Sequence, residues 1–161
     1  MGATQPFLLK DTRLLDFVRR QEPNAKGMIS VCAGTLVYAT AGLLNGRTAT
    51  SNYHHTPLLD KLGARSSGTE VAYDGKFYSA GPAIGSYEVA LRAVQDVYGK
   101  DVAHHIEQQV LQFAPNPVFN VGSPEKAGKL MALFGKYLFS PSLPLYLATG
   151  RKGAKYAASH P

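Results

Sequence analysis

The segment GMISVCAGTLVYA, which contains the chain's only cysteine, constrains the fold most. An apolar run rich in β-forming residues leads into Cys32, and small residues followed by a helical pattern come after it. This order predicts a strand over 27–31, a sharp turn at Cys32 and a helix over about 33–41. The tip of such a turn requires small residues two positions before and after it, and Ser30 and Gly34 occupy these positions.

The turn at Cys32 has two interpretations. In the first, the thiol is a nucleophile, because the first turn of the following helix offers unpaired N–H groups and the positive end of the helix dipole, which favour a thiolate. In the second, Cys32 is a buried structural residue, since free cysteine is among the most buried residue types. The local pattern does not choose between them.

Helix and strand patterns alternate along the chain, which predicts an α/β fold. The pair Asp74-Gly75 between two strand patterns predicts a β-hairpin. Ligands of such folds bind at the carboxyl ends of the strands, where Cys32 lies. The predicted helices cover residues 8–20, 33–41, 57–62, 84–98, 101–113 and 125–138, and the predicted strands cover 27–31, 47–52, 67–71 and 76–79.

The composition is that of one intracellular globular domain. The chain has 161 residues, of which 45% are hydrophobic and 17% charged. A single cysteine excludes an intramolecular disulfide, and the N-terminus lacks a secretory pattern, so a cytoplasmic location is expected. No segment offers about 18 uninterrupted apolar residues, so no membrane association is expected.

The net charge of +6 is partly carried by Arg151, Lys152 and Lys155, which have no acidic neighbours in the sequence. Nucleic-acid binding requires a basic face with interleaved aromatic residues or a known motif, and neither is visible, so no nucleic-acid partner is predicted. Residues 1–138 are expected to form the domain. Residues 139–161 are expected to form a proline-containing, basic and poorly ordered tail.

The paired histidines do not form a metal-binding pattern. His104 and His105 point about 100° apart on a helix and are poorly placed to share one ion, so no metal or cofactor is predicted. His54 and His55 follow the predicted strand 47–52. His54 faces the same way as Asn52 if the strand continues, and both histidines are loop residues if it ends.

Four segments together resemble the ThiJ/PfpI superfamily, which is class I glutamine amidotransferase-like. They are SVCAG around Cys32, GLLNGRTAT over 42–50, SAG over 79–81 and FNVGSP over 119–124. The elbow, the GLL-x-G-x-x-AT run and the FN-x-GSP ending, in that order, make the match specific. The resemblance runs from about residue 8 to 126 and is strongest to the isocyanide (isonitrile) hydratase-like branch.

The resemblance implies a flavodoxin-like three-layer α/β sandwich with a mostly parallel sheet, usually dimeric, with Cys32 as nucleophile. In the hydratase branch the thiolate attacks the terminal carbon of an isocyanide, and water converts the resulting thioimidate to an N-substituted formamide. The backbone N–H of Ala33 is then expected to stabilise developing negative charge. A small-molecule substrate, a homodimer and no cofactor follow from the same resemblance.

The chain departs from the family's pattern at three places. Family members begin with a β-α-β stretch that supplies an acidic residue beside the cysteine, whereas here MGAT resembles only the remnant of a Gly-Gly-x-Gly-Thr loop. The domain is therefore expected to be truncated at its N-terminus, with Gly2 as a candidate oxyanion-loop residue. Ala33 replaces the usual threonine, and Asn52 stands where many relatives have histidine, which leaves His54 as a candidate catalytic residue. The alternatives are a non-catalytic binding or dimerising protein and a truncated product with little activity.

Overall fold

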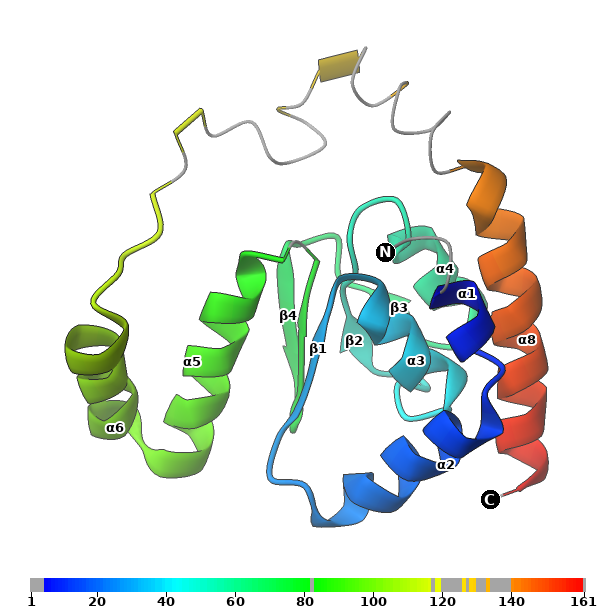
Figure 1. The fold of residues 1–161 in the computed structure, drawn as a ribbon, viewed down its shortest axis with the longest axis horizontal. Helices are drawn as coiled ribbons and strands as arrows, with labels where there is room; N and C mark the ends of the chain where they lie inside the picture. The colour runs from blue at the N-terminus through cyan, green and yellow to red at the C-terminus, as the bar shows by residue number, and fades with distance from the viewer. Residues whose placement is uncertain are drawn as a thin grey trace.

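The computed structural model describes residues 5–81, 83–116, 118–119, 126, 128–129, 133 and 140–160. Figure 1 shows the arrangement of its helices and strands. In chain order the elements are α1 Gln5–Leu8, α2 Thr12–Gln21, η1 Glu22–Asn24, β1 Met28–Val31, η2 Cys32–Gly34, α3 Thr35–Thr40, β2 Thr48–Ala49, α4 Thr56–Lys61, β3 Arg65–Ser66, β4 Val71–Asp74, β5 Phe77–Ala80, α5 Gly85–Tyr98, α6 Lys100–His105, η3 Ile106–Leu111, η4 Ser140–Ser142 and α8 Leu143–Ser159.

The centre of the fold is a three-stranded sheet in the order β1-β5-β4, with β1 parallel and β4 antiparallel to β5. A second sheet pairs β2 and β3 in parallel. Tyr78 of β5 packs with Val89 of α5 on one face, while the Phe77 ring lies edge-on to Tyr38 of α3 on the other. Both faces of the sheet are covered by helices (Figure 1). The predicted three-layer α/β sandwich with a mostly parallel sheet is confirmed.

The N-terminal helical pattern is divided, whereas the sequence predicts one helix over 8–20. The Asp11 carboxylate accepts a hydrogen bond from the Arg13 N–H at 3.1 Å, which caps the start of α2 and separates it from α1. The predicted strand over 47–52 is also shorter, because after β2 the Thr50 N–H donates to the Ser79 hydroxyl at 2.9 Å. The Thr50 N–H thus bonds to a side chain and not to the backbone of a neighbouring strand, so strand pairing ends at β2.

The hairpin predicted at Asp74-Gly75 is confirmed, with Val71–Asp74 and Phe77–Ala80 as its strands. Gly75 has φ +60°, a conformation that glycine adopts without steric cost and that a two-residue hairpin turn requires. The first strand of the hairpin, β4, lies a few residues later than the predicted range 67–71. The helix predicted over 101–113 is α6 followed by a π-helical turn, η3, which ends at Leu111 before the left-handed Gln112.

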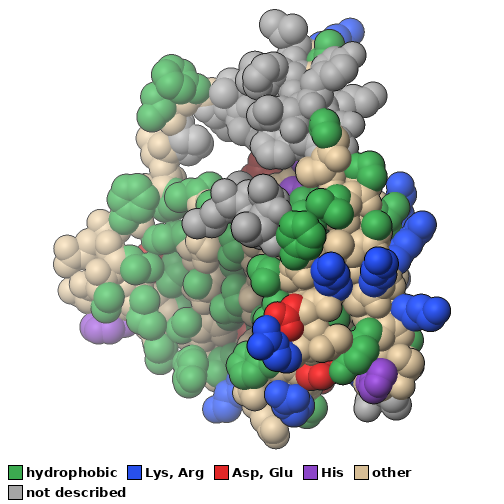
Figure 2. All heavy atoms as spheres, turned by 45° about the vertical axis from the view of Figure 1, so that its right-hand side comes forward, with side chains coloured by type: hydrophobic (Ala, Val, Ile, Leu, Met, Phe, Trp, Pro, Cys, Tyr) green, Lys and Arg blue, Asp and Glu red, His purple; other side chains and the backbone are tan. Residues whose placement is uncertain are grey.

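The prediction of a poorly ordered tail over 139–161 is wrong, because α8 is a packed helix there. It contacts α1, α2, α3 and α4. The exposed side chains of Arg151, Lys152 and Lys155 lie on its outer face, and Figure 2 shows the cationic side chains gathered on this side of the molecule. The helix predicted over 125–138 lies almost entirely outside the described residues. The buried residues of α8 are Tyr146, Thr149, Gly150, Gly153 and Ala157.

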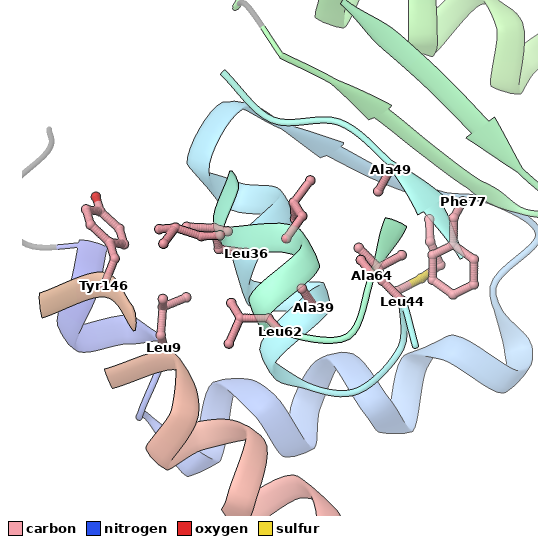
Figure 3. Packing of buried hydrophobic residues seen from close by; sticks show 12 residues of the cluster. Leu9, Leu36, Ala39, Leu44, Ala49, Leu62, Ala64, Phe77 and Tyr146 are labelled. Atoms are coloured by element: carbon pink, nitrogen blue, oxygen red, sulfur yellow. The ribbon is translucent and has the colours of Figure 1, made fainter. Parts of the chain in front are cut away.

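The largest buried cluster lies between the sheet and helices α3, α4 and α8, and it includes Leu9, which directly follows α1. Figure 3 shows Tyr146 and Leu9 beside Leu36 and Leu62 in this cluster. The cluster therefore ties α8 to the helix that follows Cys32. Among the helices described, none has the length and apolar character needed to cross a membrane.

Candidate active site

Cys32 is the first residue of η2, directly after β1 and before α3, so it lies at the strand-to-helix turn that the sequence predicts. Its φ is +58°, a left-handed conformation that is strained for any residue with a β-carbon. The same strand-to-helix turn exposes the nucleophile in enzymes that use an elbow. Ser30 and Thr35 hold the two sides of the turn together, since the buried Thr35 hydroxyl donates to the Ser30 hydroxyl at 3.0 Å.

The segment after β2 lies directly against the cysteine. The Ser51 hydroxyl donates to the Cys32 carbonyl oxygen at 2.8 Å, and Asn52 Nδ2 donates to Cys32 Sγ at 3.0 Å. Gly81 supports this approach from the end of β5, because a β-carbon there would lie 2.6 Å from the Ser51 carbonyl oxygen. Asn52 is the hydrogen-bonding partner of Sγ among the described residues.

His55 lies behind Asn52. Its side chain is 5% exposed, and its Nδ1 is 2.7 Å from Asn52 Nδ2 and 2.9 Å from Asn52 Oδ1. The ring packs edge-on against Tyr146 of α8, with centroids 4.5 Å apart. Burial lowers the pKa of the His55 imidazole, and the neighbouring His54 lowers it further, so the ring stays neutral near pH 7.

His54 and His55 belong to the turn between β2 and α4, which confirms the loop alternative for both residues. The ring of His54 lies against that of Tyr53 in a tilted arrangement, with centroids 4.1 Å apart. The structure brings His55 to Asn52, the residue that contacts the thiol. A catalytic role for His54 stays a prediction.

The other predicted site residues are placed as follows. Ala33 is buried in the first turn of η2, where backbone N–H groups lack partners within the helix. Its role in stabilising negative charge stays a prediction, and Gly2 lies outside the described residues. Within the described part of the chain, no carboxylate hydrogen-bonds Cys32 Sγ, and no group of three or more potential metal ligands occurs.

Tyr146 is the site neighbour that the sequence reasoning missed. It is 1% exposed, and burial raises the pKa of its phenol, with a further contribution from the nearby Cys32. The apolar residues Leu143 and Leu147, which also pack against the main cluster, stand at helical spacing from it. This spacing was the available signal, but Pro141 and Pro144 favoured an irregular tail.

A separate cavity of about 650 Å³ lies between α5 and the α6–η3 segment, away from Cys32. Its wall is almost entirely apolar and includes Tyr87, Leu91, Ile106 and Leu111. Neither Cys32 nor Asn52 lines it. The chemistry of the candidate site therefore rests on the contacts around the elbow and not on this cavity.

The described chain is an α/β sandwich of DJ-1/PfpI type, with its single cysteine at a strained strand-to-helix elbow. The model of the DJ-1/PfpI family matches residues 2–96, and the chain belongs to that family. The isonitrile hydratase of Pseudomonas putida is 36% identical over 144 residues, which are 89% of this chain and 63% of that protein. The chain thus spans less than two thirds of that relative's length.

Two solved structures show the same fold. A THiJ/PfpI family protein from Pseudomonas syringae aligns with a TM-score of 0.83 and 24% identity, over 92% of this chain and 61% of the other. DJ-1beta of Drosophila melanogaster aligns with a TM-score of 0.57 and 23% identity, over 65% and 56% of the two chains. The resemblance to the ThiJ/PfpI superfamily predicted from the sequence is confirmed.

Proposed function

We propose that this chain is a cysteine-dependent hydratase that converts isocyanides to N-substituted formamides. The observation that carries the proposal is the position of Cys32, at φ +58° on the elbow with an amide N–H of Asn52 at 3.0 Å from its sulfur. The 36% identity to an isonitrile hydratase supports the choice of reaction within the family.

In the proposed reaction, the Cys32 thiolate forms a bond to the terminal carbon of the isocyanide. That carbon takes up a proton from water, which gives a thioimidate. A second water adds to the same carbon and the carbon–sulfur bond breaks; one proton of this water ends on the nitrogen and the other on the hydroxide left by the first water. The products are the formamide and the free thiolate, so the net reaction adds one water to the isocyanide. The Ala33 N–H would stabilise negative charge during this sequence.

The test is turnover of an aryl isocyanide, followed by loss of the isocyanide and appearance of the formamide by mass spectrometry. We expect turnover by the chain and none by Cys32→Ser, with circular dichroism showing that both are folded. Absence of turnover by the folded chain at high protein concentration would refute the hydratase and favour the non-catalytic binding alternative.

The thioimidate offers a second readout. Because Cys32 is the only thiol, intact-mass analysis after rapid quenching should show a single adduct with the mass of one isocyanide. Cys32→Ala should show no adduct. The homodimer and the cytoplasmic location expected from the sequence remain proposals. Light scattering coupled to size-exclusion chromatography tests the homodimer.

A further inference from the structure

The carboxamide of Asn52 has one orientation that satisfies its neighbours. The backbone N–H of His55 lies 3.2 Å from Asn52 Oδ1, and an N–H group only donates, so this end of the carboxamide must be the oxygen. The nitrogen end then faces Cys32 Sγ at 3.0 Å with an N–H directed at it. The flipped orientation would oppose two N–H groups and place the amide oxygen against the sulfur.

The side chain of His55 fixes the same carboxamide. Its Nδ1 is within hydrogen-bond distance of both ends. The neutral tautomer with the proton on Nδ1 donates to Oδ1 and places no proton on the buried Nε2, which has no hydrogen-bond partner in the described part of the chain. The edge-on contact with Tyr146 restrains the imidazole from the opposite side. The Asn52 amide is thereby held between the turn backbone and a buried ring.

Protonation of the His55 imidazole to the cation is unfavourable in this environment. Its Nε2 is buried and has no hydrogen-bond partner among the described residues, so an imidazolium would carry an unmet donor inside the protein. The titratable neighbours of the pair are Tyr146 on α8, which interacts with Cys32, and His54 on the same turn, which interacts with His55. In the described part of the chain, no cationic side chain forms a hydrogen bond to Sγ.

We propose that His55 is a positioning residue, which holds the Asn52 carboxamide with its N–H on Cys32 Sγ so that an uncharged Asn–His pair favours the thiolate. A role of this pair in catalysis rests on the proposed function, whereas its effect on the ionisation of the Cys32 thiol does not. The pair is assembled by a turn four residues long, because Asn52 and His55 also join through the backbone, where the His55 N–H donates to the Asn52 carbonyl oxygen at 2.8 Å.

The test is the pH dependence of iodoacetamide alkylation, which reports on Cys32 alone in a chain with one cysteine. Asn52→Leu removes the donor at similar volume, and we expect the midpoint of the pH–rate profile to rise by about one pH unit, the size of one hydrogen bond to a charged group. At pH values below both midpoints, the alkylation rate should fall about tenfold.

His55→Phe is the decisive variant, because it keeps an aromatic ring against Tyr146 and the backbone N–H to Asn52 Oδ1 while removing Nδ1. We expect its midpoint to rise in the same direction as that of Asn52→Leu. His104→Phe, at an exposed position of α6, is the control and should leave the midpoint in place. His55→Gln supplies an amide in place of the ring and should move the midpoint back toward that of the unmodified chain.

An unchanged midpoint in folded His55→Phe, beside a raised one in Asn52→Leu, would overturn the positioning role. Unchanged midpoints in both would show that the amide N–H does not stabilise the thiolate. If His55→Phe does not fold, His55→Leu, which also lacks a hydrogen-bonding group, decides the question by the same profile. If the midpoints rise in Asn52→Leu and His55→Phe but the unmodified chain does not turn over isocyanides, the hydratase is refuted and the positioning role of His55 stands. If the unmodified chain turns over isocyanides but the midpoints of both variants are unchanged, the hydratase stands and the positioning role is refuted.

Discussion

Gly153 of α8 lies directly against the backbone carbonyl oxygen of Leu9, with no space for a β-carbon between them. On another side, a β-carbon at this position would be 2.5 Å from the Thr40 methyl group. The backbone of α8 is therefore in contact with the chain between α1 and α2 and with the end of α3. The glycine sets how closely the C-terminal helix approaches the helix that begins beside Cys32.

Gly153→Ala should lower the free energy of unfolding by about 1–3 kcal/mol, because the Leu9 carbonyl oxygen belongs to the backbone and the contact cannot relax without moving α8. Gly150→Ala is the matched comparison. Its β-carbon would meet the ends of the Leu62 side chain at 3.1 and 3.3 Å and the Thr40 hydroxyl at 3.5 Å. Alanine's better helix propensity would offset part of the cost. Urea denaturation of the two variants measures the difference. Equal stabilities would contradict the packing argument.

Asp74 joins the hairpin turn to β2, and its replacement should loosen that connection. Its carboxylate accepts the Thr48 N–H at 2.7 Å and pairs with Arg47 at 3.4 Å. Asp74→Ala should cost about 1–2 kcal/mol, since a hydrogen bond to a charged group is lost with the turn residue. Asp74→Asn keeps an acceptor and a good turn residue and should cost less. Thermal unfolding ranks them, and a larger loss for Asp74→Asn would refute this account.

Local sequence was sufficient for the features whose cause is local. The turn at Gly75 follows from the Asp-Gly pair, and the elbow at Cys32 follows from an apolar run that meets a helical pattern within a few residues. The packing of α8 has a different cause. Gly150 and Gly153 are helix-weakening residues by propensity, and only the approach of Leu9 and Thr40 in space explains why they occupy one buried face.

The candidate site divides in the same way. Cys32 was identifiable because its neighbours in the sequence form the elbow. The partnership with Asn52 depends on how a turn of the chain after β2 is carried against the end of β1, which no spacing rule contains. In the sequence, Asn52 was recognisable only as a departure from the histidine of many relatives. In the structure, its Nδ2 lies 3.0 Å from Cys32 Sγ.

Cys32 should be less favourable for folding than a glycine at the same position. Its φ of +58° costs a residue with a β-carbon about 1 kcal/mol or more, and glycine adopts this conformation freely. We expect Cys32→Gly to be more stable than Cys32→Ala by about that amount, with both variants inactive toward isocyanides. Denaturant unfolding of the two variants tests the strain directly, because each lacks the thiol. A more stable Cys32→Ala would mean that the elbow is not strained.

Stability should fall as the pH is lowered through the range where histidine titrates, and His55 should account for part of the loss. In the unfolded chain a histidine takes up its proton near pH 6.5, while burial lowers the pKa of His55 in the folded state. Between these two values the unfolded state binds more protons, so the free energy of unfolding rises with pH. The contribution is complete above about pH 6.5 and is lost as the pH falls toward the folded-state pKa, with a slope of at most about 1.4 kcal/mol per pH unit for one proton.

Urea unfolding between pH 5.5 and 7.5 should show this dependence of the free energy of unfolding on pH, and His55→Gln should reduce its slope. His104→Gln, at an exposed position of α6, is the control and should leave the slope unchanged. The same slope in His55→Gln as in the unmodified chain would show that the buried imidazole is not the group whose protonation opposes folding.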